Sequence, residues 1–196
     1  MHIGLFLDRD GTINEEVDYL SSPNELRLIH GAAEAVKEAN QLGLKVFIIT
    51  NQSGIARGML SESDLAEIHK KLIQLLDNEQ AHIDAIYYCP HHPELGNPPY
   101  RMDCDCRKPN IGMLTKAAKD FDIDLRKSFV VGDRIIDVQT GNNAGASSIL
   151  VLTGYGKEER QFLHDNHVHV DYIAKDLHDA MQYIKQTVHQ KQLSLS

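Results

Sequence analysis

Residues 3–12 read Ile-Gly-Leu-Phe-Leu-Asp-Arg-Asp-Gly-Thr, and this stretch points to both the fold and the site. Residues 3–7 form a short apolar run, which is typical of a buried strand. The run ends in two carboxylates, Asp8 and Asp10, at a turn that contains Gly11. In an open α/β sheet, ligands bind where strands end at their carboxyl side. A solvated polar turn would also contain Asp and Gly, so the rest of the chain has to distinguish a site from a turn.

The apolar pattern alternates strands with helices along the chain. Further strands are expected at residues 44–49, 83–88, 129–131 and 148–152, with an edge strand at 168–173. Helices are expected at residues 31–42, 61–77, 110–120, 135–144 and 176–187. Such alternation predicts an α/β fold with a doubly wound, mostly parallel sheet. A chain of 196 residues suits one domain, expected over 1–188, followed by a polar tail at 189–196.

Composition and charge exclude several classes of function. The net charge of −8 leaves no surplus of cations for binding nucleic acid. No apolar run approaches the roughly 20 residues that a membrane span needs. The N-terminus enters a strand almost at once, without the basic stretch and apolar region of a signal peptide. We therefore expect a cytoplasmic protein with neither nucleic-acid nor membrane partners.

Residues 89–109 hold all three cysteines of the chain and show no periodicity, which predicts an irregular loop. A structureless segment of this length inside a domain calls for a function or a staple. Cys89 and His91 form one ligand pair, and Cys104 and Cys106 form another. Three thiolates and one imidazole are typical of a structural Zn²⁺ site, although His92 competes with His91 for the fourth position. The sequence thus predicts a zinc-stapled loop, and the metal would supply the order that packing cannot.

Polar groups gather after other predicted strands or before a helix. Thr50-Asn51-Gln52-Ser53 follow one strand, Gly132-Asp133-Arg134 follow another, and Arg107-Lys108 precede a helix. In a parallel sheet these groups converge on one edge. A hydroxyl, amides, cations and carboxylates together suit phosphoryl transfer through an aspartyl phosphate, with Mg²⁺ between the repelling charges. Asp137 is open to three interpretations: water-mediated ligation, orientation of Arg134, or a place in the first turn of a helix.

These motifs, in this order, resemble the haloacid dehalogenase-like (HAD) phosphatase superfamily over nearly the whole domain. The resemblance implies that Asp8 is the nucleophile and Asp10 the general acid and base. It also implies that Thr50 and Lys108 stabilise the phosphoryl group. Mg²⁺ would be held by the Asp8 side chain, the Asp10 carbonyl and the Asp133 side chain. A phosphatase is favoured over a dehalogenase, because a leaving alkoxide needs a proton and a halide does not.

Within the superfamily, the longer motifs resemble those of the heptose bisphosphate phosphatases, and the related histidinol phosphatases share much of them. The resemblance implies a small sugar bisphosphate that loses its C7 phosphate, and a monomer. No sizeable cap domain fits between the motifs. Arg134 departs from the lysine usual in the family. The alternatives are a histidinol-phosphate phosphatase and an inactive zinc-stapled binding protein. The residues expected to contact substrate are Glu16, Tyr19, Asn51, Gln52, Ser53, Arg107 and Arg134.

Overall fold

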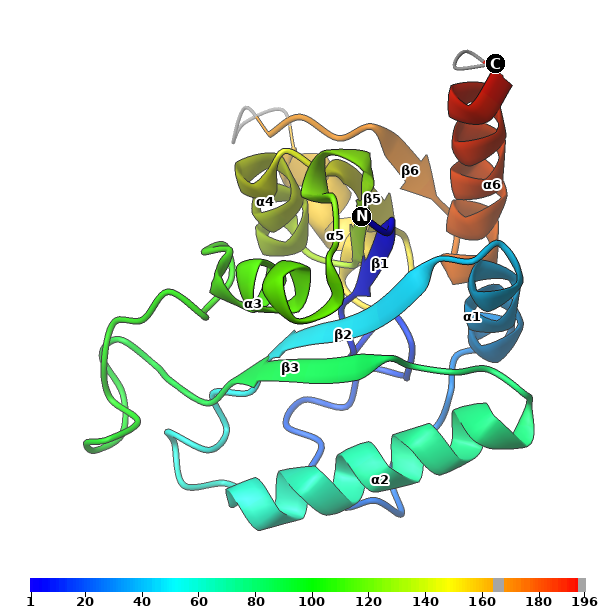
Figure 1. The fold of residues 1–196 in the computed structure, drawn as a ribbon. Coiled ribbons are helices and arrows are strands. Elements are labelled where there is room, and N and C mark those ends of the chain that lie inside the picture. The colour runs from blue at the N-terminus through cyan, green and yellow to red at the C-terminus, as the bar shows by residue number, and fades with distance from the viewer. Residues whose placement is uncertain (164–167, 194–196) are drawn as a thin grey trace.

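A six-stranded, fully parallel sheet forms the centre of the molecule (Figure 1). The structure is a computed structural model and describes residues 1–163 and 168–193. The strands are β1 (Gly4–Leu7), β2 (Lys45–Asn51), β3 (Ala85–Cys89), β4 (Phe129–Gly132), β5 (Ser147–Val151) and β6 (Tyr172–Ala174). The α-helices are α1 (Ala32–Gln41), α2 (Glu62–Asn78), α3 (Gly112–Phe121), α4 (Ile135–Ala144), α5 (Gly156–Glu159) and α6 (Leu177–Leu193). This architecture confirms the expected α/β fold class.

The order of the strands places the end of β1 at a topological switch point. The sheet runs β3-β2-β1-β4-β5-β6. From β1 the chain winds outward through β2 to β3, and it then crosses back to β4 on the other side of β1. Parallel sheets hold their ligands in the crevice at such a reversal, outside the carboxyl ends of the strands. Asp8, directly after β1, therefore lies at the position that this topology reserves for a ligand.

Helices cover both faces of the sheet, as a parallel sheet requires. Successive side chains of a strand point to opposite faces, and β1 shows this directly. Leu5 and Leu7 pack in the larger core, which includes the buried faces of α1, α2 and α6. Phe6 packs in a second core against α3 and stacks on Phe47 with ring centroids 5.1 Å apart. The core of the domain thus fixes β1, and with it the position of Asp8, from both sides.

Several boundaries differ from those expected. β2 continues to Asn51, so Thr50 and Asn51 lie within the strand, where they pair with β3. α6 runs on to Leu193 through part of the expected polar tail, because Gln and Lys are good helix formers and Val188 stays buried. The edge strand β6 is shorter than expected, and α5 with the 3₁₀ turn that follows it (η2, Arg160–Phe162) was not expected.

Two other sequence predictions concern the loop at 89–109 and the membrane. Residues 90–111, all of them described, contain neither a helix nor a regular strand, although one isolated bridge joins His92 to Arg101. A second 3₁₀ turn, η1 (Leu125–Lys127), precedes β4. Among the residues that the structure describes, no helix is both long enough and apolar enough to span a membrane.

Candidate active site

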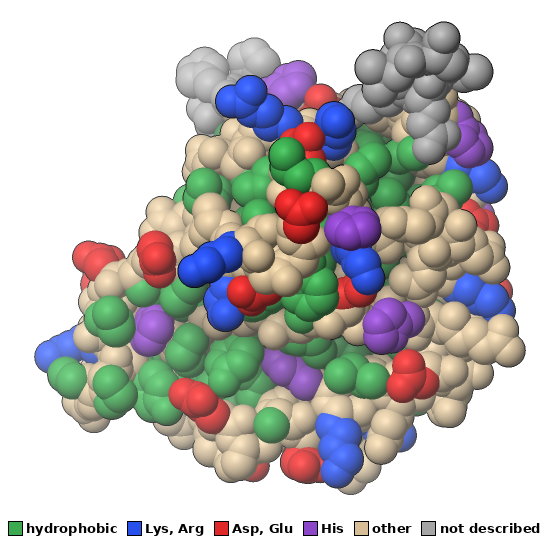
Figure 2. Space-filling view, in the orientation of Figure 1, with side chains coloured by type: hydrophobic (Ala, Val, Ile, Leu, Met, Phe, Trp, Pro, Cys, Tyr) green, Lys and Arg blue, Asp and Glu red, His purple; other side chains and the backbone are tan. Residues whose placement is uncertain are grey.

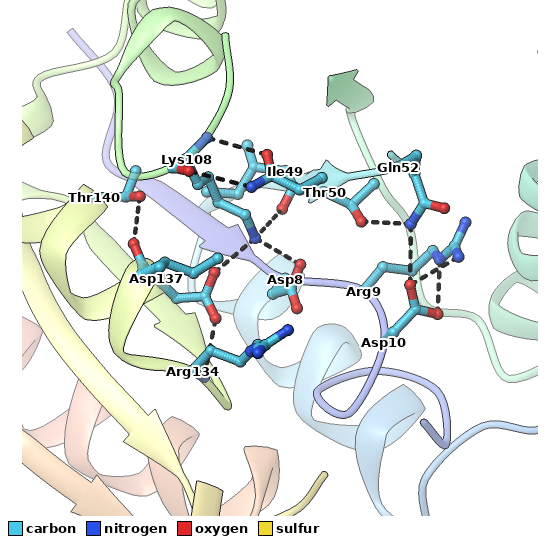
Figure 3. Close-up of polar contacts among 12 residues, drawn as sticks. Asp8, Arg9, Asp10, Ile49, Thr50, Gln52, Lys108, Arg134, Asp137 and Thr140 are labelled. Atoms are coloured by element: carbon cyan, nitrogen blue, oxygen red, sulfur yellow. Dashed lines mark hydrogen bonds and ion pairs between the residues drawn. The ribbon is translucent and has the colours of Figure 1, made fainter. Parts of the chain in front are cut away.

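The lysine from the cysteine loop lies between two carboxylates at the switch point (Figure 3). The Lys108 ammonium donates to Asp8 Oδ1 and to Asp137 Oδ1, both at 2.6 Å, and to the carbonyl of Ile49 at 3.0 Å. The backbone N–H of Asp8 donates to the Val131 carbonyl of β4 at 2.9 Å. All three charged side chains are buried. The end of β1, the start of α4 and the cysteine loop therefore meet at one charged centre.

Asn51 holds Lys108 in this position. Its side-chain amide donates to the Lys108 carbonyl at 3.2 Å, and its Oδ1 accepts the Lys108 backbone N–H at 3.0 Å. This reciprocal pair joins β2 to a segment 57 residues further along the chain. Asn51, which the sequence indicates as a substrate contact, thus also positions Lys108.

Asp137, for which the sequence left three interpretations open, has two contacts at the start of α4. One of its oxygens pairs with Lys108, as described above, and Oδ2 accepts the backbone N–H of Arg134 at 3.1 Å. Asp137 thus caps the start of α4 and carries one of the two negative charges beside Lys108. In this structure it orients the backbone of Arg134 rather than the guanidinium, whose centre lies 5.0 Å from the centroid of the Tyr155 ring.

Asp133 offers a buried oxygen that fits a cation. Its Oδ2 accepts the backbone N–H of Tyr155 at 2.8 Å, whereas its Oδ1 has no hydrogen-bond partner among the described residues. Ligand oxygens of Asp8, Asp133 and Asp137 all lie within 4.8 Å of one another. Buried polar atoms in proteins are almost always satisfied, and an oxygen-only donor set suits Mg²⁺. The cluster therefore fits a divalent cation that would complete Asp133.

Two glycines leave room for the Asp133 carboxylate. Gly11 and Gly154 have positive φ values of 76° and 50°. A Cβ atom on either residue would collide with Asp133 Oδ2. Thr153 ties the two turns together, because its hydroxyl donates to the Gly11 carbonyl at 2.6 Å. The glycine of the opening motif is thus needed for its backbone conformation and for the close approach of Asp133.

Burial and mutual repulsion shift the pKa values of these carboxyl groups. Burial raises the pKa of Asp8 to about 7, although the Lys108 ammonium opposes the shift. Burial, and then the charges of Asp8 and Asp137, raise the pKa of Asp133 to about 8. Burial alone would lower the pKa of Lys108, but the Asp137 and Asp8 carboxylates raise it above its usual value. Without a cation, Asp8 and Asp133 therefore keep their protons up to near-neutral pH, well above the range in which an exposed carboxyl group ionises.

Without divalent metal, we expect the protein to lose stability as the pH rises from about 4 to about 8. A carboxyl group whose pKa is raised from 3.8 to about 7 or 8 binds more protons in the folded state over this range, so ionisation favours unfolding. Asp133→Asn should remove one such group, so its Tm in EDTA should exceed that of the wild type by more at pH 8 than at pH 5. Thermal scans at both pH values measure this difference.

Magnesium provides the matching control for that experiment. A dication binds the ionised carboxylates of the folded state, so Mg²⁺ should raise the Tm of the wild type more at pH 8 than at pH 5, and should raise that of Asp133→Asn less. If the Tm difference between Asp133→Asn and the wild type were the same at every pH, the pKa of Asp133 would not be the one raised in the folded protein.

Asp10 lies beside the charged centre in a network of donors (Figure 3). Arg9 contacts both of its oxygens, with Nε 3.1 Å from Oδ1 and Nη2 2.8 Å from Oδ2. Asn14 donates to Oδ1 at 2.9 Å and Gln52 to Oδ2 at 3.0 Å. Burial alone would raise the pKa of Asp10, but Arg9 and the amide donors hold it below its usual value. The same Gln52 amide donates to the Thr50 hydroxyl at 2.8 Å, which links Asp10 to β2.

Arg9 and Asn14 are site residues that the sequence analysis did not assign. Both are fully buried although their side chains are polar. The sequence did contain a signal for Arg9, because it lies between two carboxylates at the end of a buried strand, and a buried charge there needs a partner. Gln52 was assigned to substrate binding, and its contacts here are to Asp10 and Thr50.

The four expected ligands of the cysteine loop converge on one point. Cys104 Sγ lies 3.5 Å from Cys89 Sγ and 3.2 Å from Cys106 Sγ. His91 Nδ1 lies 3.8 Å from Cys89 Sγ and 3.4 Å from Cys106 Sγ. A tetrahedral Zn²⁺ with bonds of about 2.3 Å places its sulfur ligands about 3.8 Å apart. The separations between these atoms approach the edges of such a tetrahedron, so the cluster could hold zinc.

His91, rather than His92, faces the thiols. His92 Nδ1 accepts the backbone N–H groups of Glu94 at 3.1 Å and Leu95 at 3.0 Å, so this nitrogen is occupied within the loop. Burial raises the pKa of Cys89, and burial with the neighbouring thiols raises that of Cys106. A cation at the centre would offset this cost by stabilising the thiolates.

The remaining expected substrate contacts lie on the loops around this centre. Arg107 Nη1 donates to the His91 carbonyl at 3.0 Å, and Tyr19 lies beneath the guanidinium of Arg57 at 5.6 Å. Arg134 Nε lies 3.6 Å from a carboxylate oxygen of Glu159. Ser53 accepts the Arg57 backbone N–H through its carbonyl. These contacts place the expected residues on surrounding loops without joining them to Asp8.

A hollow beside the centre has acidic, apolar and aromatic residues in its lining. Glu16, Asp18 and Tyr155 line it, and the Tyr155 hydroxyl donates to Asp18 at 2.9 Å. Burial, and then the charges of Asp10 and Asp18, raise the pKa of Glu16. Because the backbone N–H of Tyr155 binds Asp133, this residue links the hollow to the candidate cation site.

Comparisons with known proteins identify the family to which the chain belongs. The HAD-hydrolase-like family model matches residues 105–180. D-glycero-D-manno-heptose-1,7-bisphosphate 7-phosphatase of Chlorobaculum tepidum is 40% identical over 183 residues, which cover 90% of this chain and 91% of that protein. D-glycero-beta-D-manno-heptose-1,7-bisphosphate 7-phosphatase of Escherichia coli is 36% identical over 182 residues, covering 92% of this chain and 93% of that protein.

A solved structure extends the likeness to three dimensions. D,D-heptose 1,7-bisphosphate phosphatase from B. bronchiseptica, complexed with magnesium and phosphate, is 34% identical and superposes with a TM-score of 0.82. The alignment covers 94% of this chain and 99% of that one. The likeness therefore extends over nearly the whole chain. The chain is a phosphoric monoester hydrolase and belongs to the D-glycero-D-manno-heptose 1,7-bisphosphate 7-phosphatase family of HAD-like phosphatases.

Proposed function

We propose that the chain removes the C7 phosphate of D-glycero-D-manno-heptose 1,7-bisphosphate through an aspartyl-phosphate intermediate. The observation that carries the proposal is the placement of Asp8 at the switch point, paired with Lys108 and beside the orphaned oxygen of Asp133. A nucleophilic carboxylate, a buried cation and an unfilled cation position are the parts that phosphoryl transfer needs. The names of the relatives supply the substrate.

In the first step, an Asp8 oxygen attacks phosphorus, and the bond between phosphorus and the C7 oxygen breaks. A proton on Asp10 passes to that oxygen, so the sugar leaves as an alcohol. The negative charge of the bound phosphate raises the pKa of Asp10 and so favours its protonated form here. In the second step, water attacks the aspartyl phosphate and gives its proton to Asp10. Inorganic phosphate leaves, and both carboxyl groups return to their starting state.

The surrounding groups stabilise the phosphoryl group as charge shifts onto its oxygens. Lys108 and the Thr50 hydroxyl are placed by Asn51 and Gln52 to contact those oxygens. Mg²⁺, held by the Asp8 and Asp133 side chains and the Asp10 carbonyl, would neutralise the repulsion between carboxylate and phosphate. Lys108 pairs with both Asp8 and Asp137 and so favours the ionised form of the nucleophile, which bound Mg²⁺ would favour further.

The loops around the charged centre determine which substrate binds. Arg107 Nη1 donates to the His91 carbonyl of the cysteine loop. In this proposal Arg107 contacts the C1 phosphate that the product keeps. Glu16 and Tyr19 border the sugar, Ser53 offers its backbone, and Arg134 adds a cation on the side of Tyr155. The reaction would serve the synthesis of ADP- or GDP-heptose precursors in the cytoplasm, with a monomer acting alone.

Initial rates of phosphate release test the substrate assignment. We expect Mg²⁺-dependent turnover with the highest kcat/KM for one anomer of heptose 1,7-bisphosphate, at least about tenfold above histidinol phosphate and a generic aryl phosphate, because only the bisphosphate engages Arg107. The α and β anomers are assayed separately. A higher kcat/KM for histidinol phosphate would contradict the assignment of the substrate. If no compound were turned over in the presence of Mg²⁺, the assignment of phosphatase activity would be contradicted.

A further inference from the structure

His69 is a buried histidine that the mechanism above does not use. It lies on α2, and its Nε2 is 3.2 Å from Nη1 of Arg9. A guanidinium has donors only, so His69 Nε2 must be the acceptor and the ring must carry its proton on Nδ1. Arg9 is fully buried, and a buried N–H without a partner is costly. The histidine therefore satisfies one end of a buried cation.

The imidazole is itself held in place from the side of the sheet edge. Its ring meets Tyr88 of β3 edge to face, with centroids 5.9 Å apart. Ile73 and Ile86 line the same hollow as His69 and Tyr88. Figure 2 shows hydrophobic side chains gathered over the region of α2 and β3. Burial, and then the charge of Arg9, lower the pKa of His69 to about 3. The ring thus stays neutral and keeps its accepting nitrogen at neutral pH.

The other edge of the Arg9 guanidinium grips Asp10. Nε and Nη2 contact the two carboxylate oxygens at 3.1 and 2.8 Å, in the bidentate geometry that gives such pairs their directionality. Because the guanidinium is planar and rigid, a contact that fixes Nη1 also fixes the direction of the edge that holds Asp10. The chain of contacts therefore runs from helix α2 through His69 and Arg9 to Asp10.

We propose that His69 is a positioning residue of the phosphatase reaction, which acts through Arg9 to aim the Asp10 carboxyl group at the leaving oxygen. The inference rests on the proposed role of Asp10 as the proton donor. The other side chains that donate to Asp10, Asn14 and Gln52, come from segments outside α2. Loss of the acceptor on His69 leaves Nη1 of Arg9 without its partner, so the guanidinium turns and the Asp10 carboxyl group turns with it.

The test compares two leaving groups. A sugar alkoxide needs a proton as it departs, whereas p-nitrophenolate is stable without one, so a misplaced Asp10 slows only the first reaction. His69→Leu should lower kcat/KM for the heptose bisphosphate at least about tenfold more than kcat/KM for p-nitrophenyl phosphate. The parameter kcat/KM is used because it includes the departure of the leaving group and excludes the later hydrolysis. His69→Gln, whose Oε1 can accept from Arg9, should restore much of the difference.

Three further variants make the outcome decisive. Arg9→Lys keeps the positive charge but loses the bidentate contact with Asp10, so it should show the same selective loss. It replaces His69→Leu in the test if that variant does not fold. Leu72→Ala removes buried packing from the same helix and, with no polar side-chain group, should slow both substrates equally. Asp10→Asn should show the largest selectivity. If His69→Leu and Arg9→Lys each lost as much kcat/KM for p-nitrophenyl phosphate as for the heptose bisphosphate, while Asp10→Asn still lost more for the heptose bisphosphate, the role of His69 would be overturned and that of Asp10 would stand. An unselective Asp10→Asn would overturn the proposed proton donor itself.

Discussion

Replacement of Asp8 by asparagine is expected to lower kcat by at least about a thousandfold, because an amide cannot form the acyl phosphate. The side chain keeps its shape and can still accept from Lys108 through Oδ1. Wild-type protein quenched in acid during turnover of substrate labelled at the C7 phosphate should carry the label, and Asp8→Asn should not. The loss would be measured with a phosphate-release assay sensitive enough to detect a rate well below about a thousandth of the wild-type rate.

The fold should survive this change. Burial raises the pKa of Asp8 to about 7, so the ionised group is disfavoured in the folded protein without metal. Asparagine removes that charge, and the Tm in EDTA at pH 8 should equal or exceed that of the wild type.

A matched control comes from the opposite end of the sheet. Asp84 is a mostly buried carboxylate that pairs with Lys45 at 2.7 Å and accepts the Val46 backbone N–H at 2.8 Å. Asp84→Asn should therefore cost stability while leaving turnover near that of the wild type. Activity retained by Asp8→Asn, or lost equally in Asp84→Asn, would contradict the assignment of the nucleophile.

Loss of the cysteine cluster should remove zinc and substrate preference together. Purified protein should contain about one Zn²⁺ per chain, and the Cys104→Ser/Cys106→Ser double variant should contain none. The loop holds Arg107 through the His91 carbonyl, so its disorder should lower kcat/KM for the heptose bisphosphate at least about tenfold. Metal analysis and initial rates on the same preparations provide both measurements.

The two neighbouring histidines form a matched pair for this experiment. His91→Ala removes the nitrogen that faces the thiols, and should weaken zinc binding strongly. His92→Ala removes a nitrogen that binds two backbone N–H groups, and should leave zinc in place. Zinc retained in the double cysteine variant, or lost in His92→Ala alone, would contradict the ligand set.

Much of the fold could be predicted because its signals are local. The apolar run before Asp8 and the alternation of strands with helices predicted the parallel sheet, and Ser61 and Asp64 cap the start of α2 reciprocally, as their spacing indicates. Where boundaries differed, neighbours decided them. β2 reaches Asn51 because β3 pairs with it there, and a partner strand cannot be read from the strand's own residues.

The candidate site was predictable to the extent that its residues follow strands. Asp8 and Asp133 could be expected to converge because parallel strands end at one edge. The contacts among the other polar residues depend on side-chain direction. Asn51, which we expect to contact substrate, also clamps the Lys108 backbone, and the Asp137 oxygens contact Lys108 and the Arg134 N–H; neighbouring residues in the sequence do not specify these contacts.

The sequence by itself determined the fold class, the order of the motifs and the clustering of cysteines, because strand periodicity and motif spacing are properties of neighbouring residues. Only the tertiary structure decided which partner each buried polar group takes. Arg9 and His69 lie 60 residues apart in the sequence, and Arg9 contacts both His69 and Asp10. Such a pairing is set by the packing of α2 against the sheet, since a buried donor must find its acceptor among whatever groups the fold brings within reach.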